Sequence, residues 1–165
     1  RETPKHEIGR QFSRAAAARP IPAWIRHACG RNVPGRGCVH HILIVEDSPT
    51  MRSLVVSALE DIGVPVRITE ASSGFEALRE LPRGDYDLIV TDINMPDING
   101  LELISFVRRN AAYRSIPLLI ISTEGSERDR ERGLELGADA YLVKPFDPAA
   151  LRRTAKELLE KARGE

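Results

Sequence analysis

From residue 41 onward, the chain alternates between short apolar runs and longer amphipathic stretches. Five runs have the length and the β-branched or large apolar composition of buried strands, at residues 41–45, 64–69, 86–91, 116–121 and 139–143. A stretch with helical spacing follows each run. Because helical crossovers join parallel strands, this pattern predicts an α/β fold: a doubly wound, five-stranded parallel sheet with helices on both faces.

Start signals mark two of the predicted helices. Ser48 is an N-cap type of residue, Pro49 follows at the first helical position, and apolar residues recur at helical spacing until Gly63. Asp147 and Pro148 repeat this pair of signals before the last amphipathic stretch. We therefore expect helices to begin at these two prolines.

Residues 1–40 have a different composition, with four prolines and a glycine-rich patch at residues 30–37. Such a segment has too few apolar residues to offset the entropy lost on ordering. We expect an irregular extension with at most a short helix near residues 11–19. The folded domain is then expected at residues 41–165.

Charge divides the chain at the same place. The 24 basic and 24 acidic residues cancel overall, but residues 1–40 carry +6 and residues 42–165 carry −6. The basic residues of the extension are spread out, which favours a linker or upstream segment over an arm for nucleic acid or an anionic membrane. No apolar run approaches the ~18–20 residues of a membrane span, so we expect no membrane insertion and a cytoplasmic protein. The chain begins with Arg1 instead of Met, which suggests a fragment or a processed chain.

Polar and charged residues stand where four of the five apolar runs end. In an open parallel sheet, these carboxyl ends line the ligand site. The residues are Glu46 and Asp47, then Asp92, then Ser122 and Thr123, and finally Lys144 and Pro145. We expect three carboxylates and one ammonium to converge at this edge.

This set of residues predicts a magnesium site and phosphoryl transfer. Clustered carboxylates repel one another unless a cation intervenes, and Mg²⁺ prefers oxygen ligands. An aspartate can act as a nucleophile and form an aspartyl phosphate. Asp92 follows a run expected in the centre of the sheet, so it is the candidate nucleophile, and Glu46 and Asp47 are candidate metal ligands. As an alternative, a single acidic residue after a strand often only caps a helix, and Asp47 precedes the Ser48–Pro49 start signal.

At these residues the sequence resembles the receiver domain of two-component response regulators, and within that family the stand-alone chemotaxis type. The matching stretches are residues 42–52, 86–103, 117–125 and 137–146. The resemblance implies a flavodoxin-like fold. It also implies a phosphoacceptor role for Asp92, and Mg²⁺ bound by Asp47 and Asp92 directly, by the backbone carbonyl of Asn94, and by Glu46 through water. Glu46 stands where the family more often has Asp.

The same resemblance implies the residues of a conformational switch. Ser122 matches the switch hydroxyl, with Thr123 as the less favoured choice, and Tyr141 matches the switch aromatic. Lys144 matches the lysine that binds the phosphoryl group, and Pro145 the proline that follows it through a cis peptide bond. Asn94 and Glu124 match the positions that tune the lifetime of the phosphoryl group, and both are of the short-lived chemotaxis type.

The resemblance further implies the partners. A sensor histidine kinase donates the phosphoryl group, and a downstream protein binds the face formed by the fourth helix, the fifth strand and the fifth helix. Residues 127–132 of the fourth helix are all charged, which suits either a polar partner face or a solvated helix side. Such a protein is a signalling phosphoacceptor instead of an enzyme, and either a monomer or a phosphorylation-dependent dimer.

Other functions remain as alternatives. The chain can be a receiver cut from a larger transcriptional regulator or hybrid kinase, or a flavodoxin-like small-molecule binder or phosphatase. A phosphatase of the haloacid-dehalogenase type needs a second Asp two residues after the nucleophile, where this chain has Asn94. No output domain is expected after the last helix.

Two weaker signals concern ligands of other kinds. His27, Cys29, Cys38 and His40 are residue types that bind zinc, but their spacing is not that of a common zinc finger. Neither a G-x-G-x-x-G loop nor a P-loop occurs, so dinucleotide or ATP binding by those loops is not expected.

Overall fold

The computed structural model describes residues 39–162 of the chain. Its five strands form one parallel sheet in the order β2-β1-β3-β4-β5. The strands are β1 (His40–Val45), β2 (Val66–Ala71), β3 (Leu88–Asp92), β4 (Leu118–Ser122) and β5 (Ala140–Val143). The predicted five-stranded parallel sheet is confirmed.

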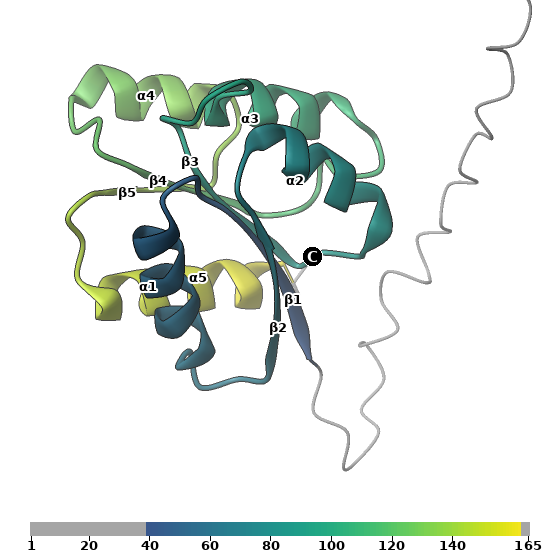
Figure 1. Cartoon of the computed structure of the whole chain (residues 1–165), viewed down its shortest axis with the longest axis vertical. Coiled ribbons are helices and arrows are strands. Elements are labelled where there is room, and N and C mark those ends of the chain that lie inside the picture. The colour runs from purple at the N-terminus through teal and green to yellow at the C-terminus, as the bar shows by residue number, and fades with distance from the viewer. Residues whose placement is uncertain (1–38, 163–165) are drawn as a thin grey trace, which may run out of the picture.

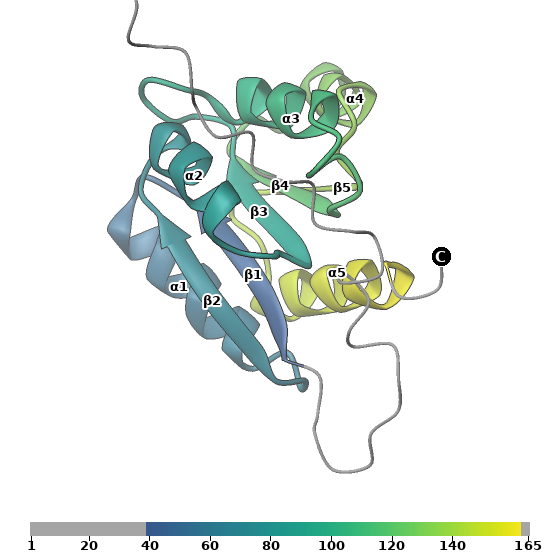
Figure 2. The same ribbon diagram turned by 90° about the vertical axis from the view of Figure 1, so that its right-hand side faces the viewer.

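The helices cover both faces of this sheet. They are α1 (Pro49–Glu60), α2 (Gly74–Glu80), α3 (Gly100–Arg109), α4 (Glu127–Glu135) and α5 (Pro148–Lys161), and a short 3-10 helix, η1 (Leu81–Arg83), follows α2. Helices α1 and α5 lie on one face and α2, α3 and α4 on the other (Figures 1 and 2). The strand order reverses between β1 and β3, so the fold is doubly wound as predicted.

Successive side chains of each central strand enter opposite apolar layers. In β1, Leu43 and Val45 pack in the layer under α2 and α3, whereas Ile42 and Ile44 pack in the layer under α1 and α5. These four side chains are at most 1% exposed. Burial on both faces explains why the strands read as continuous apolar runs in place of alternating ones.

The helix starts follow the expected chemistry. Ser48 accepts a hydrogen bond from the backbone N–H of Met51, and Asp147 accepts one from that of Ala149. Pro49 and Pro148 are the first residues of α1 and α5. Asn99 and Glu102 form a capping box at the start of α3, which holds the loop after β3 close to the sheet edge.

The second strand differs from its predicted range of 64–69. It begins at Val66 because Pro65 has no N–H to donate and contributes only its carbonyl, which accepts from the N–H of His40. The ladder with β1 then continues to the pair Val45 and Ala71. Glu70 therefore lies within the strand, and not after it as predicted.

The predicted extension falls almost wholly outside the described residues. Of residues 1–40, the structure describes Val39 and His40, and His40 is the first residue of β1, one residue before the expected domain start. The short helix expected at residues 11–19 lies outside the described part, as do His27, Cys29 and Cys38 of the zinc hypothesis.

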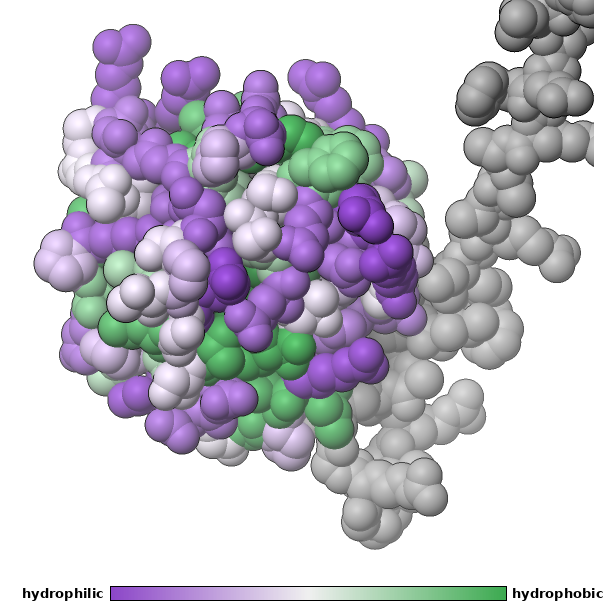
Figure 3. All heavy atoms as spheres, in the orientation of Figure 1, coloured by the Kyte–Doolittle hydropathy of each residue, from purple (hydrophilic) through white to green (hydrophobic). Residues whose placement is uncertain are grey.

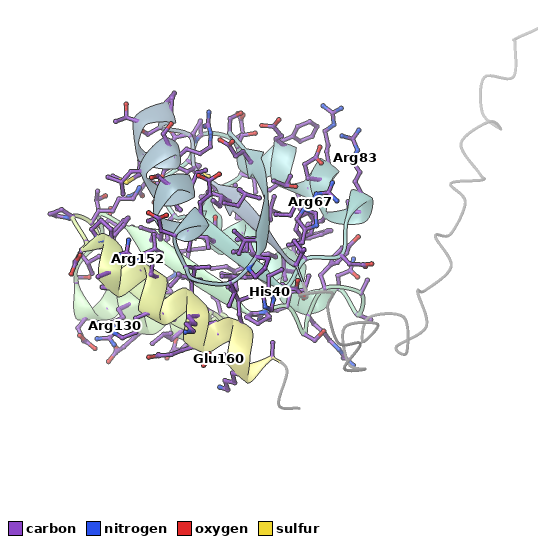
Figure 4. All side chains as sticks on the ribbon, turned by 90° about the horizontal axis from the view of Figure 1, so that it is seen from below. His40, Arg67, Arg83, Arg130, Arg152 and Glu160 are labelled. Carbon is purple, nitrogen blue, oxygen red and sulfur yellow. The ribbon has the colours of Figure 1, made fainter. Side chains whose placement is uncertain are left out.

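The face that carries α1 is mostly hydrophilic, with apolar atoms exposed in its lower half (Figure 3). The charged side chains labelled on β2, η1, α4 and α5 in Figure 4 are exposed: Arg67, Arg83, Arg130 and Glu160. Among the described residues, no helix is both long and apolar enough to cross a membrane.

Candidate functional site

The predicted strand-end residues meet at the carboxyl edge of the sheet. Asp92 is the last residue of β3, which lies between β1 and β4. Glu46 directly follows β1, Ser122 ends β4, and Lys144 directly follows β5. Neighbouring parallel strands therefore place these side chains around Asp92, although they come from distant parts of the sequence.

Lys144 joins two buried carboxylates. Its Nζ lies 2.7 Å from Oδ2 of Asp92 and 2.7 Å from Oε2 of Glu46. Asp92 is 6% exposed and Glu46 3% exposed. Burial of such charges is unfavourable unless they are paired and hydrogen-bonded, as they are in this arrangement.

Burial and pairing together shift the pKa values of Glu46 and Lys144. Burial raises the pKa of Glu46 above its usual value, and the hydrogen bond from Lys144 opposes part of that rise. For Lys144, burial disfavours the charged form, but the hydrogen bonds to Asp92 and Glu46 outweigh it and raise its pKa. The two carboxylates therefore stabilise the charged, ammonium form of Lys144.

Three carboxylates of this edge fit a divalent cation. Glu46, Asp47 and Asp92 each offer one oxygen, and these oxygens all lie within 4.8 Å of one another. Oxygens bound to one Mg²⁺ at about 2.1 Å lie up to about 4.2 Å apart, so small movements suffice to bind the ion. Asp47 is exposed whereas the other two are buried, so the cluster opens to solvent at Asp47.

Helix α1 fixes the acidic pair from its first turn. Arg52 donates from Nη1 to the backbone carbonyl of Glu46 at 2.8 Å and from Nε to Oε2 of Glu70 at 3.0 Å. The backbone N–H of Ser48 donates to Oε1 of Glu46 at 3.1 Å. Arg52 was not identified from the sequence. It could have been found from its position, because it lies six residues after Glu46 in the first turn of the capped helix.

The loop after β3 positions Asp92. The backbone N–H of Asn94 donates to Oδ1 of Asp92 at 3.2 Å. Gly100, the first residue of α3, is packed against this loop so closely that a Cβ there would lie 2.1 Å from the carbonyl oxygen of Asp92. Only glycine allows this approach, so Gly100 is a second residue that the sequence reasoning missed.

The two hydroxyl candidates occupy different environments. Ser122 is fully buried, and its Oγ accepts a hydrogen bond from the N–H of Glu124 at 3.1 Å. Thr123 is exposed, and its Oγ1 accepts from Nδ2 of Asn94 at 3.1 Å. The same Nδ2 also lies 3.3 Å from Oε1 of Glu124, so the two predicted tuning residues are in contact.

Tyr141 reaches the same segment from β5. Its hydroxyl donates to the backbone carbonyl of Glu124 at 2.6 Å, and its ring is half-buried against the apolar layer under α3. Burial raises the pKa of Tyr141, so its hydroxyl stays protonated and able to donate. Glu124 thereby contacts Ser122 through its N–H and Tyr141 through its carbonyl. The peptide bond between Lys144 and Pro145 is cis.

The family comparison covers most of the chain. The family model described as "Response regulator receiver domain" matches residues 42–156. The chain is 36% identical over 125 residues to a chemotaxis protein CheY homolog of Campylobacter jejuni, covering 75% of this chain and 95% of that protein. It is also 36% identical over 119 residues to the chemotaxis protein CheY1 of Helicobacter pylori, covering 72% of this chain and 95% of that protein.

The chain is also similar to solved structures of chemotaxis proteins and receiver domains. The chemotaxis protein CheY4 of Vibrio cholerae has a TM-score of 0.66 and 35% identity, covering 73% of this chain and 99% of that chain. The receiver domain of a sensor histidine kinase from Pseudomonas aeruginosa has a TM-score of 0.66 and 30% identity, covering 78% of this chain and 100% of that chain. That structure is described with a magnesium ion coordinated in its active site cleft.

Proposed function

Because this chain belongs to the response regulator receiver domain family, we propose that it is a phosphorylatable signalling domain whose phosphoacceptor is Asp92. The observation that carries the proposal is the position of the Asp92 carboxylate. It lies at the end of a central strand, 2.7 Å from an ammonium and within 4.8 Å of two further carboxylates. A nucleophile, a cation and a metal-competent acidic pair are thus present together.

The donor in this proposal is the phosphohistidine of a sensor kinase. A carboxylate oxygen of Asp92 forms the new O–P bond while the P–N bond of the phosphohistidine breaks. The electron pair of the P–N bond stays on the imidazole nitrogen, which takes up a proton from water. Hydrolysis of the aspartyl phosphate later returns the carboxylate and releases inorganic phosphate, so the protein acts on its own phosphoryl group and not as an enzyme on external substrates.

Magnesium belongs to the proposed site. Asp47, Asp92 and the backbone carbonyl of Asn94 would bind the ion directly, and Glu46 through water. When bound, Mg²⁺ supplies positive charge that offsets the charge of the transferring phosphoryl group. The solvent opening at Asp47 gives the ion and the donor a path to Asp92.

Lys144 and Ser122 would hold the new phosphoryl oxygens. The new phosphoryl group carries about −1.5 to −2 charges beside the Lys144 ammonium, which already contacts Asp92. The hydroxyl of Ser122 now accepts from the N–H of Glu124, and it would turn to donate to the phosphoryl group instead. That movement disturbs the segment whose carbonyl binds the hydroxyl of Tyr141.

The output of the proposed switch is the face formed by α4, β5 and α5. Tyr141 lies on β5 and α4 carries exposed charged residues, so a change of the ring position alters this face. The resemblance to chemotaxis proteins supports a chemotaxis-type signal of short lifetime and a cytoplasmic location. The similarity to a receiver domain of a histidine kinase supports the alternative that this receiver acts as part of a larger regulator or kinase.

The proposal is tested by labelling the whole chain with acetyl phosphate and Mg²⁺ and measuring its intact mass. We expect one added phosphoryl group, which chelation of Mg²⁺ or the Asp92→Asn substitution abolishes. Asp61→Asn is the matched control, because Asp61 is exposed at the end of α1 on another part of the domain. Labelling that persists in Asp92→Asn would overturn the assignment, and sustained turnover of external phosphate esters would support a phosphatase.

A further inference from the structure

Helix α4 contacts the sheet in an unusual way. Gly133 is its one buried residue, and this helix is described in full. The other residues of α4 are mainly charged, and Leu134 is 39% exposed. Because glycine is a poor helix former, its presence in the last turn of α4 lowers helix stability and points to a compensating role in packing.

The space beside Gly133 is filled by two side chains from the sheet. A Cβ at this position would lie 2.7 Å from Cδ1 of Ile120 and 3.3 and 3.4 Å from Cδ2 and Cε2 of Tyr141. Carbon atoms in favourable contact are about 3.5–4.0 Å apart, so even a methyl group does not fit. The ring of Tyr141 therefore lies against the backbone of α4 at Gly133, and an added methyl group would require the Ile120 side chain or the ring to shift.

The two neighbours of Gly133 differ in their freedom to move. Ile120 is fully buried in the central part of the sheet, whereas Tyr141 is half-buried on the short strand β5. An extra methyl group in a packed region forces a neighbouring side chain to move. Of these two side chains, the half-buried tyrosine ring has the space to do so. The hydroxyl of Tyr141 donates a hydrogen bond to the carbonyl of Glu124 at 2.6 Å, which favours the inward position of the ring.

We infer that Gly133 is the positioning residue for Tyr141: by lacking a side chain, it holds open the space between α4 and the sheet that the ring occupies. The position of the Tyr141 ring and the distance between α4 and the sheet then change together. This inference rests on the proposed function, in which Tyr141 is the switch aromatic. The inference adds that α4 contributes to this switch through its backbone at Gly133.

The test uses the full chain labelled with ¹³C in its tyrosine rings and observed by NMR without phosphodonor or Mg²⁺. The chain has three tyrosines. The signals that disappear in Tyr141→Phe are those of Tyr141. In Gly133→Ala we expect the Tyr141 ring signals to move measurably from their wild-type positions towards their denatured-state values. The signals of Tyr86 and Tyr113 should stay in place.

A second variant separates positioning from simple packing strain. Ile120→Val removes the Cδ1 atom that lies nearest to the new methyl group and leaves only its contacts with the ring. In Ile120→Val/Gly133→Ala the Tyr141 signals should still move, while Ile120→Val alone should leave them in place. If Gly133→Ala alone does not fold, the comparison of Ile120→Val/Gly133→Ala with Ile120→Val tests the inference. Glu131→Ala, an exposed site in the same helix, is the control for helix propensity.

Unmoved Tyr141 signals in the folded Gly133→Ala or in the double variant would overturn the inference, because the strain would then be absorbed elsewhere. The measurement is made on the unphosphorylated chain, so its outcome is independent of whether Asp92 accepts a phosphoryl group. Loss of labelling in the Asp92 experiment would instead remove the proposed function and leave the Gly133 packing result intact.

Discussion

Lys144 donates a hydrogen bond to Oδ2 of Asp92 at 2.7 Å, across 52 residues of sequence. The same ammonium lies 2.7 Å from Oε2 of Glu46, and both carboxylates are more than nine-tenths buried. The lysine thus keeps two carboxylates close together in a place where they would otherwise repel. It also stands where a phosphoryl group on Asp92 would form.

Removal of this cation is expected to destabilise the domain. Lys144→Met leaves two buried carboxylates without their partner, and we expect the free energy of unfolding to fall by about 3 kcal/mol at neutral pH without Mg²⁺. Urea unfolding followed by circular dichroism measures this change. Lys156→Met, at an exposed position of α5, is the control and should change stability by less than about 0.5 kcal/mol. Equal stability of the Lys144 variant and the wild type would contradict the pairing described above.

Asp47 should have opposite effects on stability with and without magnesium. Asp47→Asn removes one of three clustered carboxylates, so stability without Mg²⁺ should rise, by up to about 1 kcal/mol. The stabilisation that the wild type gains from added Mg²⁺ should largely disappear, because ligand binding stabilises only a protein that binds the ligand. Thermal unfolding across a series of Mg²⁺ concentrations measures both effects, with Asp61→Asn as the control. An undiminished response to Mg²⁺ would remove Asp47 from the proposed metal site.

The sequence was most informative about the strand ends. Parallel strands deliver their last residues to one edge, so Glu46, Asp92 and Lys144 could be brought together from the order of apolar runs alone. The bounds of β2 were wrong because apolar residues continue on both sides of Pro65 and only the ladder with β1 shows where pairing stops.

The contacts that the sequence left out depend on distances between elements. Arg52, on α1, donates to the carbonyl of Glu46 after β1, a contact that depends on how close the helix and the strand end lie in the folded chain. Gly100 and Gly133 matter because a helix approaches Asp92 or Tyr141 closely there. A glycine in the sequence signals either a turn or a close approach, and the partner in that approach is visible only in the folded chain.

Arg108 should be a major source of stability at the opposite edge of the sheet. Its Nε donates to the carbonyl of Gly137 at 2.7 Å, its Nη1 to the carbonyls of Arg114 and Ile116 at 3.1 and 2.8 Å, and its Nη2 to Asp139 at 2.9 Å. We expect Arg108→Ala to lower the free energy of unfolding by about 3 kcal/mol, because several charge-assisted hydrogen bonds are lost together.

Lysine should not replace this arginine. Arg108→Lys keeps the charge but lacks the planar fork that contacts four partners, so it should recover less than half of the lost stability. Urea unfolding of both variants tests this, with the exposed neighbour Arg109→Ala as the control. Full recovery by lysine would show that charge alone, through Asp139, stabilises this edge.

His41 should make the domain less stable as the pH falls below about 6.5. Burial of the ring and, secondly, the nearby charge of Arg67 lower the pKa of His41, while Asp85 and Asp87 oppose part of that shift. The ring lies 4.3 Å from the ring of Tyr86, centroid to centroid, and its Nε2 is 2.8 Å from Oγ1 of Thr69. Folding therefore favours the neutral imidazole.

The sign of the pH dependence follows from this preference. Above the unfolded-state pKa the ring is neutral in both states, and its contribution to stability is fully present. Between that pKa and the lower folded-state pKa, the unfolded chain binds the proton more readily, so stability falls as the pH falls. We expect the free energy of unfolding of His41→Gln, measured with urea from pH 8 to pH 5, to decline less steeply than that of the wild type. Tyr86→Phe keeps the imidazole and should retain the wild-type slope, and a His41→Gln slope equal to that of the wild type would show that other groups carry the acid sensitivity.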